Sequence, residues 1–420
     1  HLLALSSERI TPEERSIGTY TRRKLRKLST WFGDDGWFAA ECKQLDQFHG
    51  LPMFGPPQRA PPDAIILRLH WNYRSKVDGT RRARLCCDGS PRAVPELHKN
   101  AETFASSLEH PMWRMFVALA TALGHIIFGG DAKDAYAHSP GPSRPTFARL
   151  DDAFIEWYFL RFGKRISRDQ VLPILRAMQG HPEAGRLWEA HVTAILLSLG
   201  WRSTTHEKNI YQMIFDGIKV LLARQVDDLA IACPNAAMAK KIVRAIGERL
   251  QLPSEVELPI EFQGVLTSFN GYDILQTADY TKLSAESYLR RVLKGHGWET
   301  PGSKESQPGA KPKSPLNDTE VKVLYLAAPG PKEGTSEHRD LALTVGYGYR
   351  NVLGELLYAY VLCRLDIAYA ITTLAKFSIA PNIEHYRALK RLAVYLRQTI
   401  DWGIIFWRPT PNPDLPRVPF

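Results

Sequence analysis

Gln225-Val226-Asp227-Asp228 places two adjacent carboxylates between apolar stretches of the chain. Upstream, the runs 210–215 and 218–225 flank Asp216-Gly217, and this pattern predicts a β-hairpin with a two-residue turn. A second turn through Asp227 and Asp228 should lead into a strand over 229–232. Adjacent acids repel one another unless a cation lies between them, so the pair indicates a divalent metal site at a hairpin tip.

A third carboxylate fits the same arrangement. Ile126-Ile127-Phe128 predicts a short strand that ends at Gly129-Gly130, and Asp131 follows at once. A helix over 112–123 should precede it, capped by Ser106 and Glu109 and closed by Gly124. If the two strands lie side by side, all three acids reach one sheet edge. That edge suits two Mg²⁺ ions about 3.5–4 Å apart, held by few protein oxygens.

Simpler interpretations of these acids stay open. Asp is common in turns, so Asp227 and Asp228 are also typical of a solvated loop. Asp131 is equally typical of a capping residue. The combination of three acids with apolar strands favours the metal site over either interpretation alone.

Composition limits the class of protein and its partners. The 420 residues carry a formal charge of +10 with a pI near 9.3, which favours a polyanionic partner such as nucleic acid. No apolar run reaches membrane-spanning length, so we expect no membrane partner. The five cysteines have neither zinc-site nor disulfide-framework spacing, which indicates a reducing compartment. With His1 in place of Met and no signal peptide, we expect an unsecreted fragment of a longer reading frame.

A family resemblance appears in the ordered motifs. Asp131-Ala132-Lys133-Asp134-Ala135-Tyr136, followed by Val226-Asp227-Asp228, resembles the palm of a reverse transcriptase. The stretch 178–188 and Gly271-Tyr272-Asp273-Ile274 are similar to their counterparts in copia-type long-terminal-repeat retrotransposons. The segments 364–370 and 385–396 resemble the helical tail of the same family. The resemblance runs from about Trp37 to about Phe406.

The resemblance implies a fold and a domain order. The fold class is α+β: a right-hand polymerase of fingers, palm and thumb, whose antiparallel palm sheet is backed by helices, plus a C-terminal helical region. A hairpin of strands 65–73 and 82–86 around Asp78-Gly79 would belong to the fingers. The helix from Ser284 to Lys294 would open the thumb. The predicted segments are a basic, Pro-rich N-terminus (1–61), fingers and palm (62–280), the thumb start (281–298), a flexible linker (299–340), the helical region (341–408) and a tail (409–420).

A basic cluster lies near the N-terminus of the predicted domain order. Arg22 to Lys27 form a dense basic cluster, which is typical either of a phosphate contact or of a solvated tail.

Integrase and ribonuclease H would be further Pol polyprotein domains of the full-length element, outside this chain. We expect the protein in cytoplasmic virus-like particles and in the nucleus.

The acids receive their roles from the resemblance. Asp131 and Asp227 would bridge two Mg²⁺ ions, with Mn²⁺ as an alternative, and Asp228 would be the third acid. The backbone carbonyl of Ala132 would complete one metal's ligands. Gln225 stands where the family usually has an aromatic residue beside the primer terminus, which puts activity in doubt.

Further residues are predicted to contact the deoxynucleoside triphosphate or the primer. Arg82 and Arg84 share one face of their strand, and guanidinium groups match phosphate oxygens in pairs. An exposed basic strand is the alternative. Tyr136 would stack under the sugar and exclude a 2′-hydroxyl, or else be a core tyrosine. The other predicted contacts are Lys76, the backbone N–H groups of Asp134 and Ala135, Gln179-Gly180 near the incoming base, and Gly271 near the primer backbone.

These features predict an RNA-directed DNA polymerase that extends a DNA primer on an RNA template with deoxynucleotides. A catalytically decayed relic that only binds nucleic acid is the alternative, motivated by the net charge and by Gln225. A metal-dependent nuclease shares the carboxylates, but it explains neither Tyr136 nor the predicted fingers hairpin.

Overall fold

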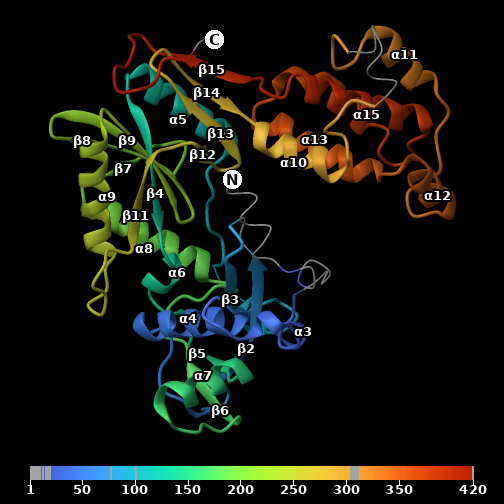
Figure 1. Ribbon diagram of the computed structural model, residues 1–420. Helices are drawn as coiled ribbons and strands as arrows, with labels where there is room; N and C mark the ends of the chain where they lie inside the picture. Colours follow the sequence, from blue (N-terminus) through green and yellow to red (C-terminus); the bar gives the residue numbers. More distant parts are fainter. Residues whose placement is uncertain are drawn as a thin grey trace.

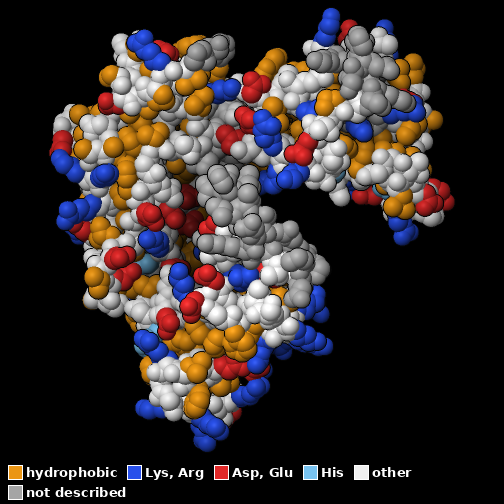
Figure 2. Space-filling model, viewed as in Figure 1, with side chains coloured by type: hydrophobic (Ala, Val, Ile, Leu, Met, Phe, Trp, Pro, Cys, Tyr) orange, Lys and Arg blue, Asp and Glu red, His pale blue; other side chains and the backbone are white. Residues whose placement is uncertain are grey.

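The computed structural model describes residues 11, 14, 20–75, 78–99, 102–302 and 312–418. This part of the chain is a mixed α+β structure with three β-sheets and a lobe of helices. In Figure 1 the helical lobe extends to the right of the sheets, and the blue N-terminal elements lie at the bottom. Figure 2 shows a hollow between these two parts, with acidic side chains gathered beside it over the sheet on the left.

The first sheet has the strand order β1-β6-β5-β2-β3. Strands β2 and β3 form the hairpin predicted around Asp78-Gly79, in register from Arg68 opposite Asp88 to Ser75 opposite Arg81. Their apolar side chains pack against α4 and α7 in one core. The elements are α4 (Trp37–Gly50), β1 (Gln58–Arg59), β2 (Ile65–Ser75), β3 (Arg81–Asp88), β5 (Thr146–Arg149), α7 (Asp152–Phe162) and β6 (Gln170–Pro173).

The central sheet has the order β11-β4-β10-β9-β8-β7 and is antiparallel throughout. Ile126 and Phe128 of β4 face α8 and α9, whereas Ile127 faces α5. Because both faces are covered, the strands read as continuous apolar runs. The elements are α5 (His110–Ala122), β4 (Ile126–Ala132), α8 (Ala184–Ser198), β7 (Arg202–Ser203), β8 (Ile210–Phe215), β9 (Ile218–Gln225), β10 (Asp228–Cys233), α9 (Ala236–Leu250) and β11 (Ile260–Val265).

The third sheet joins distant parts of the chain. Its order is β12-β13-β14-β15, and Ser284 at the end of β14 pairs with Gly403 at the start of β15. The chain therefore leaves this sheet and returns to it at the same place, and the helical lobe fills the excursion. The strands are β12 (Ser268–Phe269), β13 (Tyr272–Gln276), β14 (Tyr280–Ser284) and β15 (Gly403–Trp407).

The helical lobe packs around its own apolar core, in which Leu356 and Leu392 are fully buried. Asn382 caps α15 as its position suggests, because its side chain accepts from the N–H groups of Glu384 and His385. None of the described helices has the length and apolar content that a bilayer span needs. The helices are α10 (Glu286–Gly295), α11 (Asp318–Leu326), α12 (Ser336–Val345), α13 (Tyr349–Leu362), α14 (Ala368–Ala375) and α15 (Ile383–Gln398).

The predicted linker over 299–340 contains two helical segments, and residues 303–311 lie outside the described part. Helix α11 begins with a capping box between Asn317 and Glu320, and α12 begins at Ser336. The segment reads as a linker because little of it is buried: Leu324 is the fully buried residue of α11, and α12 has none. Partial burial needs few apolar residues, so composition alone did not reveal these helices.

The ends of the predicted segments also need correction. The helical region was expected to reach 408, but 403–407 form strand β15. The tail from 409 is anchored, because the Asn412 N–H donates to the Ala278 carbonyl and Leu415 is buried in the core beneath the central sheet. Neither end could be read locally, since β15 depends on the distant strand β14 and the tail depends on Ala278 and the core of the central sheet.

Two predicted helix caps are wrong. Ser106 does not cap α5; its hydroxyl donates to Glu189 of α8 instead. Ser284 ends β14, and Ala285 is the N-cap of α10. The Gly124 position does follow the expectation, with φ +72 just after α5. Ser106 fails as a cap because Glu189 takes its hydroxyl, and Ser284 fails because it belongs to strand β14.

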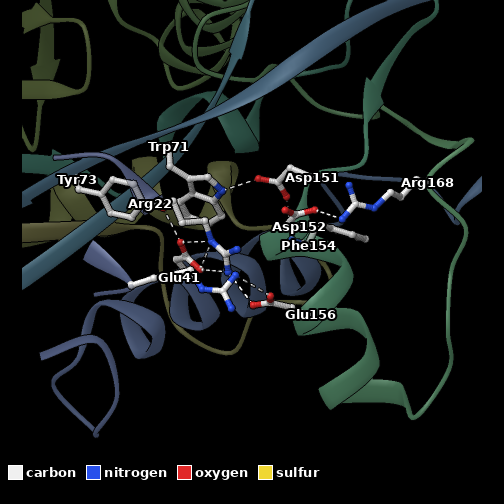
Figure 3. A network of polar contacts seen from close by, with 10 residues as sticks. Arg22, Glu41, Trp71, Tyr73, Asp151, Asp152, Phe154, Glu156 and Arg168 are labelled. Carbon is white, nitrogen blue, oxygen red and sulfur yellow. Dashed lines mark hydrogen bonds and ion pairs between the residues drawn. The ribbon is translucent and has the colours of Figure 1, made fainter. Parts of the chain in front are cut away.

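Within the basic cluster at 22–27, Arg22 is held by buried and partly buried carboxylates and does not lie in a solvated tail. Arg22, in helix α3 (Arg22–Leu25), pairs with the buried carboxylate of Glu41 at 2.9 Å and with Glu156 at 2.8 Å. Tyr73 also donates to Glu41 at 2.5 Å, and Figure 3 shows the network joining α3, α4, β2 and α7. Burial raises the pKa of Glu41, and Arg22 opposes that rise.

Short 3-10 helices occur at Ser29–Trp31, Pro95–Leu97 and Leu365–Ile367.

The Arg22–Glu41 pair predicts a stability difference between two arginine variants. Arg22→Ala leaves the Glu41 carboxylate buried without a charged partner, so the free energy of unfolding should fall by about 3 kcal/mol. Arg26→Ala removes an exposed pair with Glu156, so it should cost no more than about 0.5 kcal/mol. Urea unfolding of both variants measures the difference; equal small losses would contradict the role given to Glu41.

Candidate functional site

The carboxylate hairpin, residues 225–228, is where the two predicted acid motifs meet. Asp228 pairs with Gln225 across the turn and with Asp131 of β4 on its other side. The Ala132 N–H donates to the Asp227 carbonyl at 3.1 Å, and the Trp188 indole donates to the Val226 carbonyl at 2.6 Å. Residues directly opposite in an antiparallel pair point to one face of the sheet. The register therefore places Asp131 and Asp228 side by side.

Val226 at the turn has an unusual backbone conformation. Its φ is +57, in the left-handed region that β-branched residues rarely adopt. Such backbone strain costs about 1–3 kcal/mol and persists only where the surroundings impose it. Here the bonds from Ala132 and Trp188 hold the turn on both sides. The chain thus maintains a strained turn in order to present two acids at its tip.

Sequence reasoning missed a fourth acid, Glu261. It pairs with Asp131 from the other side of β4, so Glu261, Asp131 and Asp228 form one cross-strand row. Lys133 lies 3.4 Å from the Glu261 carboxylate and partly offsets its charge. Strand β11 begins at Ile260, so Glu261 lies within it and opposite Asp131.

Burial and mutual repulsion perturb the acids. Burial, then Asp227 and Asp131, raise the pKa of Asp228 to about 6. Burial, then Asp227 and Glu261, raise the pKa of Asp131. Like charges opposite one another in a sheet destabilise it. The site therefore holds excess negative charge that a bound cation would neutralise.

The predicted metal ligands supply suitable donor atoms, and their arrangement around a metal stays a prediction. All the candidate ligands are oxygens, which Mg²⁺ prefers. Within the described residues, however, no three His, Cys, Asp or Glu side chains are grouped closely enough to hold a metal ion. Asp131, Asp227 and Asp228 are thus neighbours by strand pairing, without converging on one point. The carbonyl of Ala132 lies at the end of β4, next to this row.

Basic residues of the first sheet lie close enough to these acids to interact with their charges. Ala83 and Leu85 of β3 are buried, so Arg82 and Arg84 share the opposite face as predicted. Burial and Arg84 lower the pKa of Arg82, while Asp134, Asp131 and Asp227 act in the other direction. Arginines of one sheet and acids of another therefore face a common space. Lys76, also predicted here, lies outside the described residues.

Tyr136 lies in the same space. It is partly buried against the core of the central sheet. Burial, then Asp227, raise the pKa of Tyr136, and Arg84 opposes them. The tyrosine therefore packs against the core and also borders the carboxylates.

The turn before Tyr136 keeps two backbone donors free. Asp134 has φ +47 and precedes helix α6 (Ala135–His138), and its carboxylate accepts from Gln47 of α4. The Lys133 N–H donates to the Pro259 carbonyl at 2.8 Å. Among the described residues, the N–H groups of Asp134 and Ala135 make no hydrogen bond. They stay available in the way the sequence suggested.

Gly180 makes a close approach, but to β3 rather than to an open space. The Cys87 N–H donates to the Gln179 carbonyl at 2.9 Å, and Gly180 has φ +93. A Cβ at Gly180 would lie 2.0 Å from the Cys87 carbonyl oxygen. Packing between these segments therefore accounts for the glycine without any ligand.

Gln225 and Gly271 both have contacts within the chain. The Gln225 side chain accepts from the Leu108 N–H at 2.9 Å, which ties the carboxylate hairpin to the segment before α5. Gly271 has φ +86, and a Cβ there would lie 2.6 Å from the Tyr358 hydroxyl. Gln225 thus has a structural partner, and Gly271 allows α13 to approach the β12–β13 turn.

A cavity of about 410 Å³ leads from the carboxylate hairpin to the helical lobe. It begins at Asp228, follows the β12–β13 turn past Gly271, and ends against α10 and α13. The lobe residues on its wall went unnoticed at the sequence level, since nothing local relates them to the acids. They are Ser287, Tyr288, Arg291 and Tyr358.

The antiparallel sheet with paired acid motifs agrees with comparisons to known proteins. Residues 59–301 match the family described as reverse transcriptase (RNA-dependent DNA polymerase). This match spans more than half of the 420 residues, and the chain belongs to that family.

The similar proteins include Pol polyproteins of copia-type retrotransposons. The chain is 22% identical over 379 residues to the retrovirus-related Pol polyprotein from transposon RE2 of Arabidopsis thaliana, covering 88% of this chain and 23% of the relative. It is 25% identical over 364 residues to that from transposon RE1 of the same plant, covering 85% and 22%. The chain thus spans less than a quarter of the length of these relatives. A foamy viral protease-reverse transcriptase bound to double-stranded DNA aligns at 12% identity with a TM-score of 0.41, over 85% of this chain and 48% of that one.

The raised pKa of Asp228 predicts a pH-dependent stability difference. The folded chain holds this proton up to about pH 6, whereas the unfolded chain loses it near about pH 4. The folded state thus binds more protons in that window, and wild-type stability falls as pH rises through it. Without divalent cations, Asp228→Asn should be more stable than wild type at neutral pH by about 1 kcal/mol, discounted for partial exposure, with no difference near about pH 4.

Urea unfolding in a chelator, across this pH range, measures the difference. Asp216→Asn is the matched control, because Asp216 lies at the tip of the neighbouring β8–β9 hairpin and pairs with Lys241 at the surface. A variant of Asp228 that is less stable than wild type at neutral pH would contradict the repulsion described here.

Proposed function

We propose that this chain is the RNA-directed DNA polymerase domain of a copia-type retrotransposon. The observation that carries the proposal is the β4–β10 register, which sets Asp131 beside Asp228 at the carboxylate hairpin. Family membership supports it, because the match includes both acid motifs. The substrates would be an RNA template, a DNA primer and deoxynucleoside triphosphates.

The first two sheets and the helical lobe would then correspond to the fingers, palm and thumb of a right-hand polymerase. The first sheet with α4 and α7 would be the fingers, and the central sheet with α5, α8 and α9 the palm. The thumb would begin at α10. The hollow between the helical lobe and the first sheet, visible in Figure 2, would receive the template and primer. In the full-length element, integrase and ribonuclease H would be further domains, and the protein would act in cytoplasmic particles and the nucleus.

The acids would hold two Mg²⁺ ions, or Mn²⁺ in their place. Asp131, Asp227, Asp228 and the Ala132 carbonyl are the groups that would hold them, and their excess negative charge favours such binding. When bound, such ions lower the pKa of an attacking hydroxyl and neutralise a departing pyrophosphate. The role of the chain is to present oxygens on a rigid strand pair, with the strained Val226 turn held by Trp188.

The fingers strand would bind the triphosphate. Arg82 lies within electrostatic reach of Asp131 and Asp227, and Arg84 shares its strand face, so their guanidinium groups would neutralise phosphate oxygens. The free N–H groups of Asp134 and Ala135 would add uncharged donors. Lys76 stays a proposed companion on the same hairpin.

Sugar, base and primer contacts complete the proposal. Tyr136 lies within electrostatic reach of Asp227 and Arg84, and its ring would lie under the sugar and exclude a 2′-hydroxyl. Gln179 and Gly180, packed on β3, would lie near the incoming base. Gln225 and Gly271 would lie near the primer end.

A nucleic-acid-binding relic without catalysis is the second candidate. It is favoured by Gln225, whose side chain is held by Leu108, and by the lack of convergence among the acids within the described residues. Both candidates predict salt-sensitive binding to nucleic acid. Catalysis in the presence of Mg²⁺ separates them.

Replacing one shared acid should abolish synthesis. Asp227→Asn removes a charged oxygen from the proposed metal set, so primer extension on an RNA template should fall by about 1,000-fold or more. Gel-resolved extension of a labelled DNA primer measures the rate. Asp216→Asn, the same change on the adjacent hairpin tip, should leave the rate within about twofold. Extension that persists in Asp227→Asn would refute the assignment of the acids.

Tyr136 variants test sugar selection separately from activity. Tyr136→Val opens space beneath the sugar, so the use of ribonucleotides relative to deoxynucleotides should rise by about tenfold or more. Tyr136→Phe keeps the ring and should retain the wild-type ratio. Single-nucleotide incorporation of matched ribo- and deoxynucleotides gives kcat/KM for each. An unchanged ratio in Tyr136→Val would return Tyr136 to a purely core role.

A further inference from the structure

Among the described residues, the helical lobe meets the rest of the chain in two regions, the third sheet with the adjoining start of α10 and the end of α13. One is the third sheet, where Ser284 and Gly403 are paired, so both crossings lie side by side. Two adjacent crossings alone would let the lobe pivot, because they define a single narrow connection. The second place is the end of α13, which lies against α5. This second contact is what limits rotation about the first.

Arg114 of α5 makes the second attachment. Its Nη1 donates to the carbonyls of Val361 at 2.8 Å and Leu362 at 2.7 Å. These carbonyls belong to the last turn of α13, where helix carbonyls lack internal partners and carry partial negative charge. A guanidinium at this position therefore supplies both hydrogen bonds and a favourable charge. Leu362 itself is fully buried in the core around α5.

The same guanidinium reaches the β12–β13 turn. Arg114 Nη1 lies 3.3 Å from the Tyr272 hydroxyl, directly after Gly271. The His110 ring packs against both Tyr272 and Tyr358, at centroid distances of 5.6 and 6.0 Å. Arg114 thus connects the turn, α5 and the lobe through one side chain.

These groups form the walls of the 410 Å³ cavity. Tyr272 and Gly271 line its sheet side, Tyr358 lines its lobe side, and Asp228 lies at its end. The distance between the two walls depends on how α13 is held against α5. A residue that fixes this contact therefore fixes the width of the space that leads to the acids.

We propose that Arg114 is a positioning residue that holds the helical lobe against the β12–β13 turn and so sets how firmly a primed template is held. This inference rests on the proposed function for its ligand, a primer–template duplex. Arg114 touches neither the acids nor the proposed triphosphate site, so it should affect duplex binding and leave nucleotide binding unchanged.

The test compares Arg114→Ala and Arg114→Lys with wild type. The Kd of a fluorescent DNA primer on an RNA template is measured by anisotropy without nucleotide. The KM values for duplex and for deoxynucleotide, and the product length per binding event with a trap, are then measured separately. Arg114→Ala should raise the duplex Kd and KM by about tenfold and shorten products, with the nucleotide KM within about twofold.

Arg114→Lys should give duplex Kd and KM values between those of wild type and Arg114→Ala. Its ammonium group keeps the positive charge at the end of α13 but lacks the planar donor geometry of a guanidinium. Arg244→Ala is the matched control: Arg244 is exposed on α9, across the central sheet from α5, and pairs only with Glu248 among the described residues. It removes the same charge, so it should leave both KM values near wild type. Thermal unfolding accompanies each variant, and Arg114→Lys carries the test if Arg114→Ala does not fold.

The outcomes separate this inference from the proposed function. If wild type extends primers and Arg114→Ala binds duplex as wild type does, the positioning role is overturned while the polymerase stands. The positioning role would also be overturned if Arg114→Ala lowered kcat, raised both KM values and lowered thermal stability together. Such a result would indicate a general structural defect. If wild type does not extend primers, the polymerase fails, and the duplex Kd of the variants still decides the role of Arg114.

Discussion

The antiparallel pairing of β4 with β10 is the constraint on which the rest of the site depends. It brings Asp131 next to Asp228, although the two lie 97 positions apart in the chain. The pairing is costly at its end, because three acids in one cross-strand row repel one another and burial strengthens the repulsion. The buried apolar strands on both sides outweigh that cost. Stable sheet structure thus holds an electrostatically unfavourable group of acids in place.

The remainder of the molecule complements that negative charge or directs access to it. Arg82 and Arg84 stand on a different sheet, so the space between the sheets lies between acids and bases. The first sheet is made rigid by the buried network around Glu41, which ties the N-terminal helix to β2 and α7 (Figure 3). A rigid first sheet keeps Arg82 and Arg84 in a constant orientation relative to each other. The proposed polymerase activity needs this constancy, because misplaced charge loses most of its effect on a transition state.

The helical lobe differs in how it is held. Its own core is continuous, but its connection to the sheets is narrow: a pair of strands at Ser284 and Gly403, and the end of α13 under Arg114. A body with few attachments can change its orientation without disturbing either core. The cavity that ends at Asp228 lies between the lobe and the sheets, so lobe orientation and access to the acids are connected.

The amino-acid sequence by itself determined the local elements whose signals are contained in a few neighbouring residues. The Asp216-Gly217 hairpin, the strands on either side of it, and the helices begun by Asn235 and Asn382 all follow from turn and capping chemistry that needs no distant partner. Only the tertiary structure decided which distant segments and side chains lie next to one another. Glu261 joins Asp131 because β11 pairs with β4, Gly180 is required by the Cys87 backbone, Ser106 bonds Glu189 instead of capping α5, and β15 returns to β14 across the whole lobe. Each of these depends on strand register or packing between segments far apart in the chain, and such pairings leave no trace in local composition or periodicity.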